Sequence, residues 1–131
     1  MRSDGFRRAI ESEDPEALVD CLAEDVRFLS PVVFRPYEGR ELVGTILTEG
    51  AMRVFEGFRY RHQIEEGLTA ALVFSARVDD REVDGLDLLR FDGDGRVSEL
   101  TVMVRPMSGL NALAEAMARE FERLGITPPR G

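Results

Sequence analysis

The sequence predicts an α+β fold formed by a single domain, residues 1–131, in which helices precede an antiparallel sheet. Two observations lead to this prediction. Apolar residues recur near every 3.6 positions before about residue 56 and at every second position after it. The alternating segments are joined by short polar turns, which are typical of antiparallel hairpins. Because the helices come first and the strands follow, the order indicates α+β rather than α/β.

Helix-start signals precede the sheet. Ser3 can cap a first helix, and Asp14 followed by a proline predicts the start of a second helix that runs to about Ala23. A third helix is expected over residues 39–55. A short strand, residues 26–30, is expected between the second and third helices.

Four strands in close order are expected after the third helix, at residues 58–65, 68–78, 83–91 and 97–105. A last helix, capped by Ser108, places its apolar residues on one stripe and ends at Gly125. A curved sheet wrapped around helices would leave a pocket between the two layers.

Composition excludes several classes of function. The net charge of -8 would repel phosphate backbones and anionic lipid surfaces, so neither nucleic acid nor a membrane is expected as a partner. The single cysteine, Cys21, excludes an internal disulfide and fits a reducing compartment. The charged N-terminus does not resemble a signal peptide, so a cytoplasmic location is expected.

No metal or cofactor is expected from the spacing of possible ligands. One histidine and one cysteine provide no zinc motif. The turn that begins at Asp92 has the start of a calcium loop, but Arg96 and Met103 stand where ligands would be needed.

Asp87 is the most informative polar residue. It is the one charged member of an otherwise apolar alternating face that runs from Val83 to Phe91. An unpaired buried carboxylate is costly, so such a group finds hydrogen-bond donors, raises its pKa or has a function. Two interpretations stay open: a structural aspartate held by a hydroxyl or amide, and an acid, base or ligand contact in a pocket.

His62, the only histidine, has the same parity as Phe58 and Tyr60 and is therefore expected to face inward. It could be a hydrogen-bonded core or rim residue. Its ordinary titration range also suits proton transfer. A pair formed by Asp87 and His62 is the best acid/base constellation that the sequence offers.

The same parity argument predicts the pocket wall. Ser30 precedes Pro31 and shares the inward parity of Phe28, so it is expected to be a small polar contact rather than a nucleophile. Tyr37 and Tyr60 could donate hydrogen bonds to a ligand or serve as amphipathic wall. The predicted ligand-binding residues are Phe6, Phe28, Ser30, Phe34, Tyr37, Tyr60, Leu72, Phe74, Leu89 and Val102.

Three segments carry a resemblance to a known family. They are "LVDCLAEDVRFLSP", "YEGRELV" and "DGLDLLRFDGDGRVSELTVMVRP". In this order the chain resembles the nuclear transport factor 2-like superfamily, in its SnoaL-like branch. The resemblance implies a cone-shaped, cystatin-like fold with a deep apolar pocket and a homodimer. It also implies a range of activities: ketosteroid isomerase, polyketide cyclase, dehydratase and epoxide hydrolase, beside binders without catalysis.

A comparison with ketosteroid isomerase, position by position, argues against that activity. The family's base is an aspartate directly before a proline, where this chain has Ser30. Its oxyanion tyrosine matches Phe6, and its second donor, an aspartic acid, matches Asp87. At two of the three positions the side chain that the reaction requires is absent, so ketosteroid isomerase activity is not expected.

Two functions therefore stay open. The first is a protein that binds a small apolar molecule without an assigned reaction. The second is an isomerase, cyclase or dehydratase type of enzyme that moves a proton on an apolar carbonyl compound, with Asp87 and His62 as acid and base. A homodimer is expected through the outer face of the sheet, where Ala71, Val73 and Met103 present apolar side chains.

Overall fold

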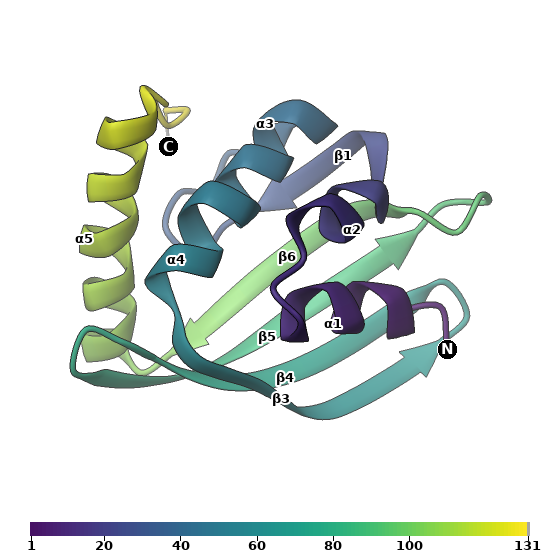
Figure 1. Ribbon diagram of the computed structural model, residues 1–131, viewed down its shortest axis with the longest axis horizontal. Coiled ribbons are helices and arrows are strands. Elements are labelled where there is room, and N and C mark those ends of the chain that lie inside the picture. The colour runs from purple at the N-terminus through teal and green to yellow at the C-terminus, as the bar shows by residue number, and fades with distance from the viewer. Residues whose placement is uncertain (131) are drawn as a thin grey trace.

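The computed structural model describes residues 1–130, in which six helical segments lie on one side of a sheet or at its edge (Figure 1). The N-terminal pair is α1 (Asp4–Glu11) and α2 (Pro15–Asp20). A continuous helical run follows, made of α3 (Arg40–Thr45), the π-helical segment η1 (Ile46–Ala51) and the short α4 (Met52–Val54). The last helix is α5 (Met107–Leu124).

The sheet has six strands in the order β2-β1-β6-β5-β4-β3. The strands are β1 (Leu22–Leu29), β2 (Tyr37–Glu38), β3 (Glu56–Glu66), β4 (Thr69–Val78), β5 (Arg81–Phe91) and β6 (Val97–Arg105). Only β1 and β6 pair in parallel, and every other neighbouring pair is antiparallel. The sheet is curved and open, and helices α1 to α4 cover one of its faces (Figure 1). The α+β prediction is therefore confirmed.

Local sequence signals explain two of the helix ends. The Asp14 carboxylate accepts a hydrogen bond from the Ala17 amide at 3.1 Å, as expected of an N-cap ahead of a proline. Helix α5 ends at Gly125, whose φ of 71° places it in the left-handed region.

The other two predicted caps are wrong. Ser3 makes no capping bond; its hydroxyl donates to Glu65 at 2.8 Å and fixes α1 to β3 instead. Helix α5 already begins at Met107, so Ser108 lies inside the helix.

Several elements differ from the prediction. Helix α2 ends at Asp20 and β1 begins at Leu22. The strand therefore begins four residues earlier than predicted, in a segment that had been expected to be helix or loop. The long third helix exists, but η1 interrupts its α-helical geometry between Ile46 and Ala51.

Strand β3 contains a bulge at Arg61 that reverses the facing of the residues beyond it. Tyr60 lies opposite Phe74 and His62 lies opposite Val73, so two residues of β3 correspond to one of β4. Tyr60 is buried, whereas His62 is exposed on the outer face of the sheet. The prediction that His62 faces inward is therefore wrong, because it assumed unbroken alternation along the strand.

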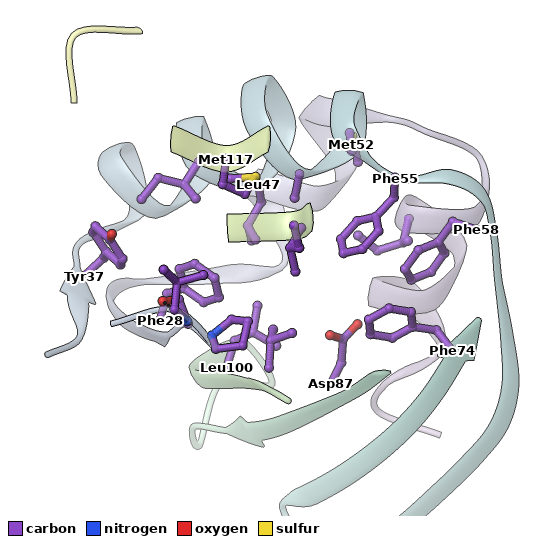
Figure 2. Close-up of a pocket in the computed structure, with 18 of the residues that line it drawn as sticks. Phe28, Tyr37, Leu47, Met52, Phe55, Phe58, Phe74, Asp87, Leu100 and Met117 are labelled. Atoms are coloured by element: carbon purple, nitrogen blue, oxygen red, sulfur yellow. Dashed lines mark hydrogen bonds between the residues drawn. The ribbon is translucent and has the colours of Figure 1, made fainter. Parts of the chain in front are cut away.

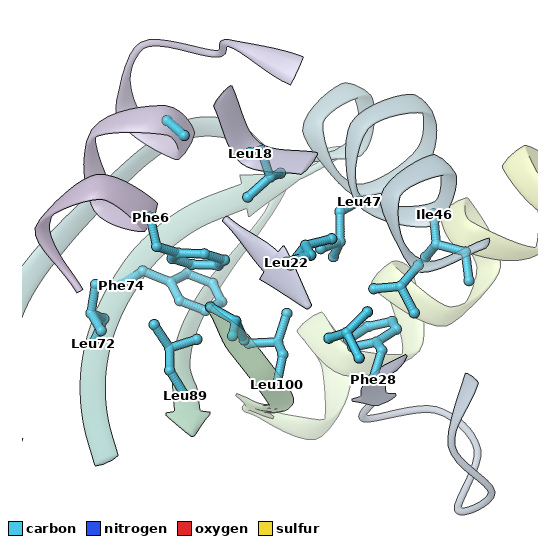
Figure 3. Packing of buried hydrophobic residues seen from close by; sticks show 14 of the residues in the cluster. Phe6, Leu18, Leu22, Phe28, Ile46, Leu47, Leu72, Phe74, Leu89 and Leu100 are labelled. Carbon is cyan, nitrogen blue, oxygen red and sulfur yellow. The ribbon is translucent and has the colours of Figure 1, made fainter. Parts of the chain in front are cut away.

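The core lies between the inner face of the sheet and the helices. Phe6 of α1 and Leu18 of α2 pack toward the sheet residues Leu72, Phe74 and Leu89 (Figure 3). Leu72 and Leu89 have no exposed surface at all. Core residues also lie on α3, η1 and α5, so the same buried cluster borders the cavity. Among residues 1–130 no helix is long and apolar enough to cross a bilayer.

Candidate functional site

A cavity of about 380 Å³ lies between the inner face of the sheet, the run from α3 to α4, and helix α5. Its volume is within the range of small-molecule pockets. Apolar side chains form nearly all of its wall. Figure 2 labels ten of the lining residues: Phe28, Tyr37, Leu47, Met52, Phe55, Phe58, Phe74, Asp87, Leu100 and Met117.

The floor of the cavity is set by strand register. Phe28 of β1 lies beside Leu100 of β6, and Val102 of β6 lies beside Asp87 of β5. Residues two apart on one strand share a face, so Leu100 and Val102 both point at the cavity. Asp87 therefore projects from the floor, with apolar neighbours on the adjoining strand.

Asp87 is the only carboxyl group that is buried among residues 1–130, with 7% of its surface exposed. The Tyr60 hydroxyl donates a hydrogen bond to its Oδ2 at 2.6 Å. Burial opposes the charged form and raises the pKa of Asp87 to about 7, while the Tyr60 hydrogen bond acts in the opposite direction. Near neutral pH this carboxyl group can therefore either donate or accept a proton.

Tyr60 stays protonated beside that carboxyl. Burial and the adjacent Asp87 raise its pKa well above the ordinary value for tyrosine. Its ring meets Phe58 edge to face at a centroid distance of 5.0 Å, and the Arg7 guanidinium lies 5.8 Å from the ring centroid. These contacts fix the direction of the hydroxyl, so Tyr60 is a constant donor to Asp87.

An aromatic cluster surrounds the Asp87 end of the cavity. Phe58 stacks on Phe74 at 4.6 Å, and Phe55 meets Phe74 edge to face at 5.5 Å. The ring of Phe74 lies over Gly85, where an added Cβ would stand 2.0 Å from Phe74 Cζ. The glycine is thus required by the close approach of that ring.

Tyr37 lies at the far end of the cavity from Asp87 (Figure 2). Its ring stacks on Phe28 at 5.9 Å and meets Phe121 of α5 edge to face at 5.7 Å. Burial raises the pKa of Tyr37. Its hydroxyl makes no hydrogen bond with residues 1–130.

Ser30 lines the cavity but also has a structural role. Its Oγ accepts hydrogen bonds from the Val32 and Val33 amides, both at 3.2 Å. The side chain therefore closes the turn that follows β1. Because both contacts use the oxygen as acceptor, the hydroxyl proton stays available to the cavity.

The structure separates the predicted site residues into groups. Seven line the cavity: Phe6, Phe28, Ser30, Tyr37, Phe74, Asp87 and Val102. Tyr60, Leu72 and Leu89 are buried beside it in the core. Phe34 is 90% exposed and is not part of the wall, because it lies in the loop between β1 and β2. His62 lies on the opposite face of the sheet from Asp87, so the predicted acid/base pair does not form within the chain.

Sequence reasoning missed the wall contributed by helix α5. Leu113, Met117 and Phe121 line the cavity from that helix, and Pro128 adds to the wall from the segment after it. The apolar stripe of α5 was visible in the sequence. Periodicity reports which face is covered, but it does not distinguish packing against a core from facing a cavity.

No group of three potential ligands among His, Cys, Asp and Glu is positioned for a metal ion within residues 1–130. The other carboxylates of the cavity wall are Glu11 and Glu13, both exposed. The chemistry that the interior itself supports therefore rests on Asp87 with Tyr60, on Ser30 and on Tyr37.

A family model described as the SnoaL-like domain matches residues 4–100. The chain belongs to the SnoaL-like family. No curated protein matches it. The matched region ends before α5, so part of the cavity wall in this SnoaL-like protein comes from outside the segment that defines the family.

Solved structures support the same assignment. A crystal structure of a steroid delta-isomerase from Pseudomonas aeruginosa is 41% identical, with a TM-score of 0.88 over 94% of this chain and 90% of that chain. An uncharacterized protein with a cystatin-like fold from Silicibacter pomeroyi is 30% identical, with a TM-score of 0.88 over 92% and 85%. An NTF2-like protein of unknown function from Cytophaga hutchinsonii, 20% identical, has a TM-score of 0.66 over 82% and 89% and shows the fold alone. The predicted family and its cystatin-like fold are confirmed.

Proposed function

We propose that this SnoaL-like protein binds an apolar small molecule that carries a carbonyl group, with Asp87 as the polar contact. The observation that carries the proposal is a single buried carboxyl group, with a pKa of about 7, at one end of an apolar cavity. A neutral carboxylic acid in such surroundings is a hydrogen-bond donor. Recognition of a carbonyl oxygen is the simplest use for it.

The Tyr60 contact supports this assignment of donor and acceptor. Tyr60 donates to Oδ2, so Oδ2 acts as an acceptor and the proton of the neutral acid resides on Oδ1. A ligand carbonyl accepts that proton in a hydrogen bond. The apolar surroundings of Asp87 strengthen this contact and penalise ligands that leave the carboxyl group unpaired.

A second candidate function is proton transfer on the same kind of ligand, as in an isomerase, cyclase or dehydratase. Two observations favour it: the pKa of Asp87 lies near neutral pH, and the 41% identical structure is named a steroid delta-isomerase. Against isomerisation stands Ser30, at the position where a carboxylate base would be required. With His62 on the other face, Asp87 would have to serve as the acid and the base in turn.

Binding of 6-propionyl-2-dimethylaminonaphthalene, a fluorescent aryl ketone, tests the proposal. The donor form of Asp87 is lost above its pKa, so affinity should be constant at low pH and fall up to tenfold per pH unit above about pH 7. The Asp87→Asn variant keeps an N–H donor and should bind the ketone without this pH dependence. Asp84→Asn, on the same strand but paired with Arg105 outside the cavity, should retain the wild-type profile.

Two results would contradict the proposal: failure of the ketone to bind at any pH, or identical pH profiles for the wild type and Asp87→Asn. The second candidate is examined separately by following conversion of androst-5-ene-3,17-dione to its conjugated isomer. Turnover that disappears in Asp87→Asn would establish an isomerase, and absence of turnover would argue against isomerisation of this ketone.

A further inference from the structure

The cavity has a polar group at each of two ends. Tyr37 is on β2 and Asp87 is on β5, and β1 and β6 lie between these strands in the sheet. Three interstrand spacings amount to roughly 14 Å across the strands, and Asp87 lies two residues away along β5 from the residue in line with Tyr37. Figure 2 shows the two side chains at opposite sides of the cavity.

Between these ends the floor is apolar. Phe28 pairs with Tyr37 on one side and with Leu100 on the other, and Val102 pairs with Asp87. All three intervening side chains line the cavity. A molecule that spans the cavity therefore contacts mainly hydrocarbon along its length, with the Ser30 hydroxyl as a further polar group of the wall.

Tyr37 has the properties of a ligand contact rather than of a core tyrosine. Its residue surface is 5% exposed, yet its hydroxyl has no partner among residues 1–130. No buried side-chain oxygen or nitrogen lacks a partner among residues 1–130, so the Tyr37 hydroxyl itself has accessible surface on the cavity wall, where a ligand can reach it. The stacking on Phe28 and the edge contact with Phe121 hold the ring in place, so the donor is oriented before a ligand enters.

From this arrangement we infer that Tyr37 forms a second polar subsite and that the ligand is an elongated, rigid apolar molecule with an oxygen acceptor at each end. The inference rests on the proposed function, since Asp87 binds one of the two oxygens. Flexible chains fit less well, because ordering them to reach both ends would cost conformational entropy.

Saturated steroid ketones are suitable probes because their oxygens are fixed at opposite ends of a rigid skeleton and they cannot undergo double-bond isomerisation. The dissociation constants of 5α-androstane-3,17-dione, 5α-androstan-3-one and 5α-androstan-17-one are compared by displacement of the fluorescent ketone. One additional hydrogen bond should make the dione bind roughly threefold to tenfold more tightly than either monoketone. Tyr37→Phe keeps the stacked ring and removes only the hydroxyl.

In Tyr37→Phe the dione should lose its advantage, while the better monoketone binds as it does to the wild type. This change in preference would not follow from a purely structural role, which would weaken all three ligands alike. An equal preference for the dione in both proteins would overturn the Tyr37 subsite and leave the proposed function standing. Failure of all three ketones and of the fluorescent ketone to bind would overturn the proposed function and this inference together.

Discussion

The carboxyl group of Asp87 makes the stability of the protein depend on pH. Its pKa is about 7 in the folded chain, whereas an unfolded aspartate titrates near 3.9. Between these values the folded state holds a proton that the unfolded state has released. The free energy of unfolding therefore falls by roughly 4 kcal/mol as pH rises from about 4 to about 7, and it levels off above that pH.

Asp87→Asn should remove this contribution. Urea unfolding of both proteins at pH 5 and pH 8 would give the difference in stability at each pH. From pH 5 to pH 8 the free energy of unfolding of the wild type should fall by roughly 2–3 kcal/mol relative to that of the variant, since groups other than Asp87 titrate alike in both proteins. Parallel profiles would mean that Asp87 ionises as an ordinary exposed aspartate does.

The sequence predicted that Asp87 is buried, but it did not predict which residue forms a hydrogen bond with it. One charged residue on an apolar alternating face is a strong signal of an enclosed carboxyl group. The partner, Tyr60, lies two strands away, and its choice over His62 depends on one bulge in β3. A bulge leaves alternation intact on both sides of it, so periodicity alone does not reveal its position.

Among the elements, β4 and β5 are linked by the contact between Phe74 and Gly85. Gly85→Ala would place a methyl group 2.0 Å from Phe74 Cζ and force the ring away from Phe58. Overpacking of this kind costs about 1–3 kcal/mol. Thermal unfolding should show the loss, and affinity for the fluorescent ketone should fall as the aromatic cluster moves.

Gly93→Ala is the matched control for this change. An added Cβ at Gly93 meets no heavy atom within 4 Å, so its effect should stay within about 0.5 kcal/mol. Equal stability of the two alanine variants would show that the Phe74 ring moves aside at no cost.

The helical run from Arg40 to Val54 was predicted from the sequence only in part. Its apolar positions predicted one long helix, and the chain is helical throughout. The π-helical segment η1 was not predicted; it packs against α5, where Met117 stands over Gly50. Such contacts depend on residues more than sixty positions away in the chain.

The outer face of the sheet is the surface through which we expect the molecule to form a dimer. Two rows of facing residues cross it: Ile64, Ala71, Leu88 and Thr101, and beside them His62, Val73, Leu86 and Met103. Ile64 is 65% exposed and Met103 is 53% exposed. Because burial of exposed apolar side chains favours association, we predict that a second copy of the chain covers this face.

Light scattering at micromolar concentration should therefore give the mass of a dimer. Met103→Glu places a charge in the middle of the outer face and should yield a folded monomer, because the side chain is already half exposed. Gly93→Glu adds the same charge to the turn between β5 and β6 and should remain dimeric. A monomeric wild type would contradict the assignment of this face.

The order of helices and strands, the sheet pairing from β3 to β6 and the position of the inner face were within reach of the sequence, since short turns and alternation determine them. Neither the parallel pairing of β1 with β6 nor the placement of α5 against the cavity could be derived in this way. Both join segments distant in the chain, and local patterns carry no information about such contacts.

The bulge at Arg61 also determines how this chain can be aligned with its relatives. Removing Arg61 would leave Tyr60 inward, His62 outward and Gln63 inward, which is the order that the folded strand already has. The residue therefore behaves as an insertion. An alignment with a relative that has a regular strand here needs a gap at position 61. Without that gap, every position from 62 to 66 is compared with a residue on the wrong side of the sheet, and a conserved surface would be mistaken for a conserved interior.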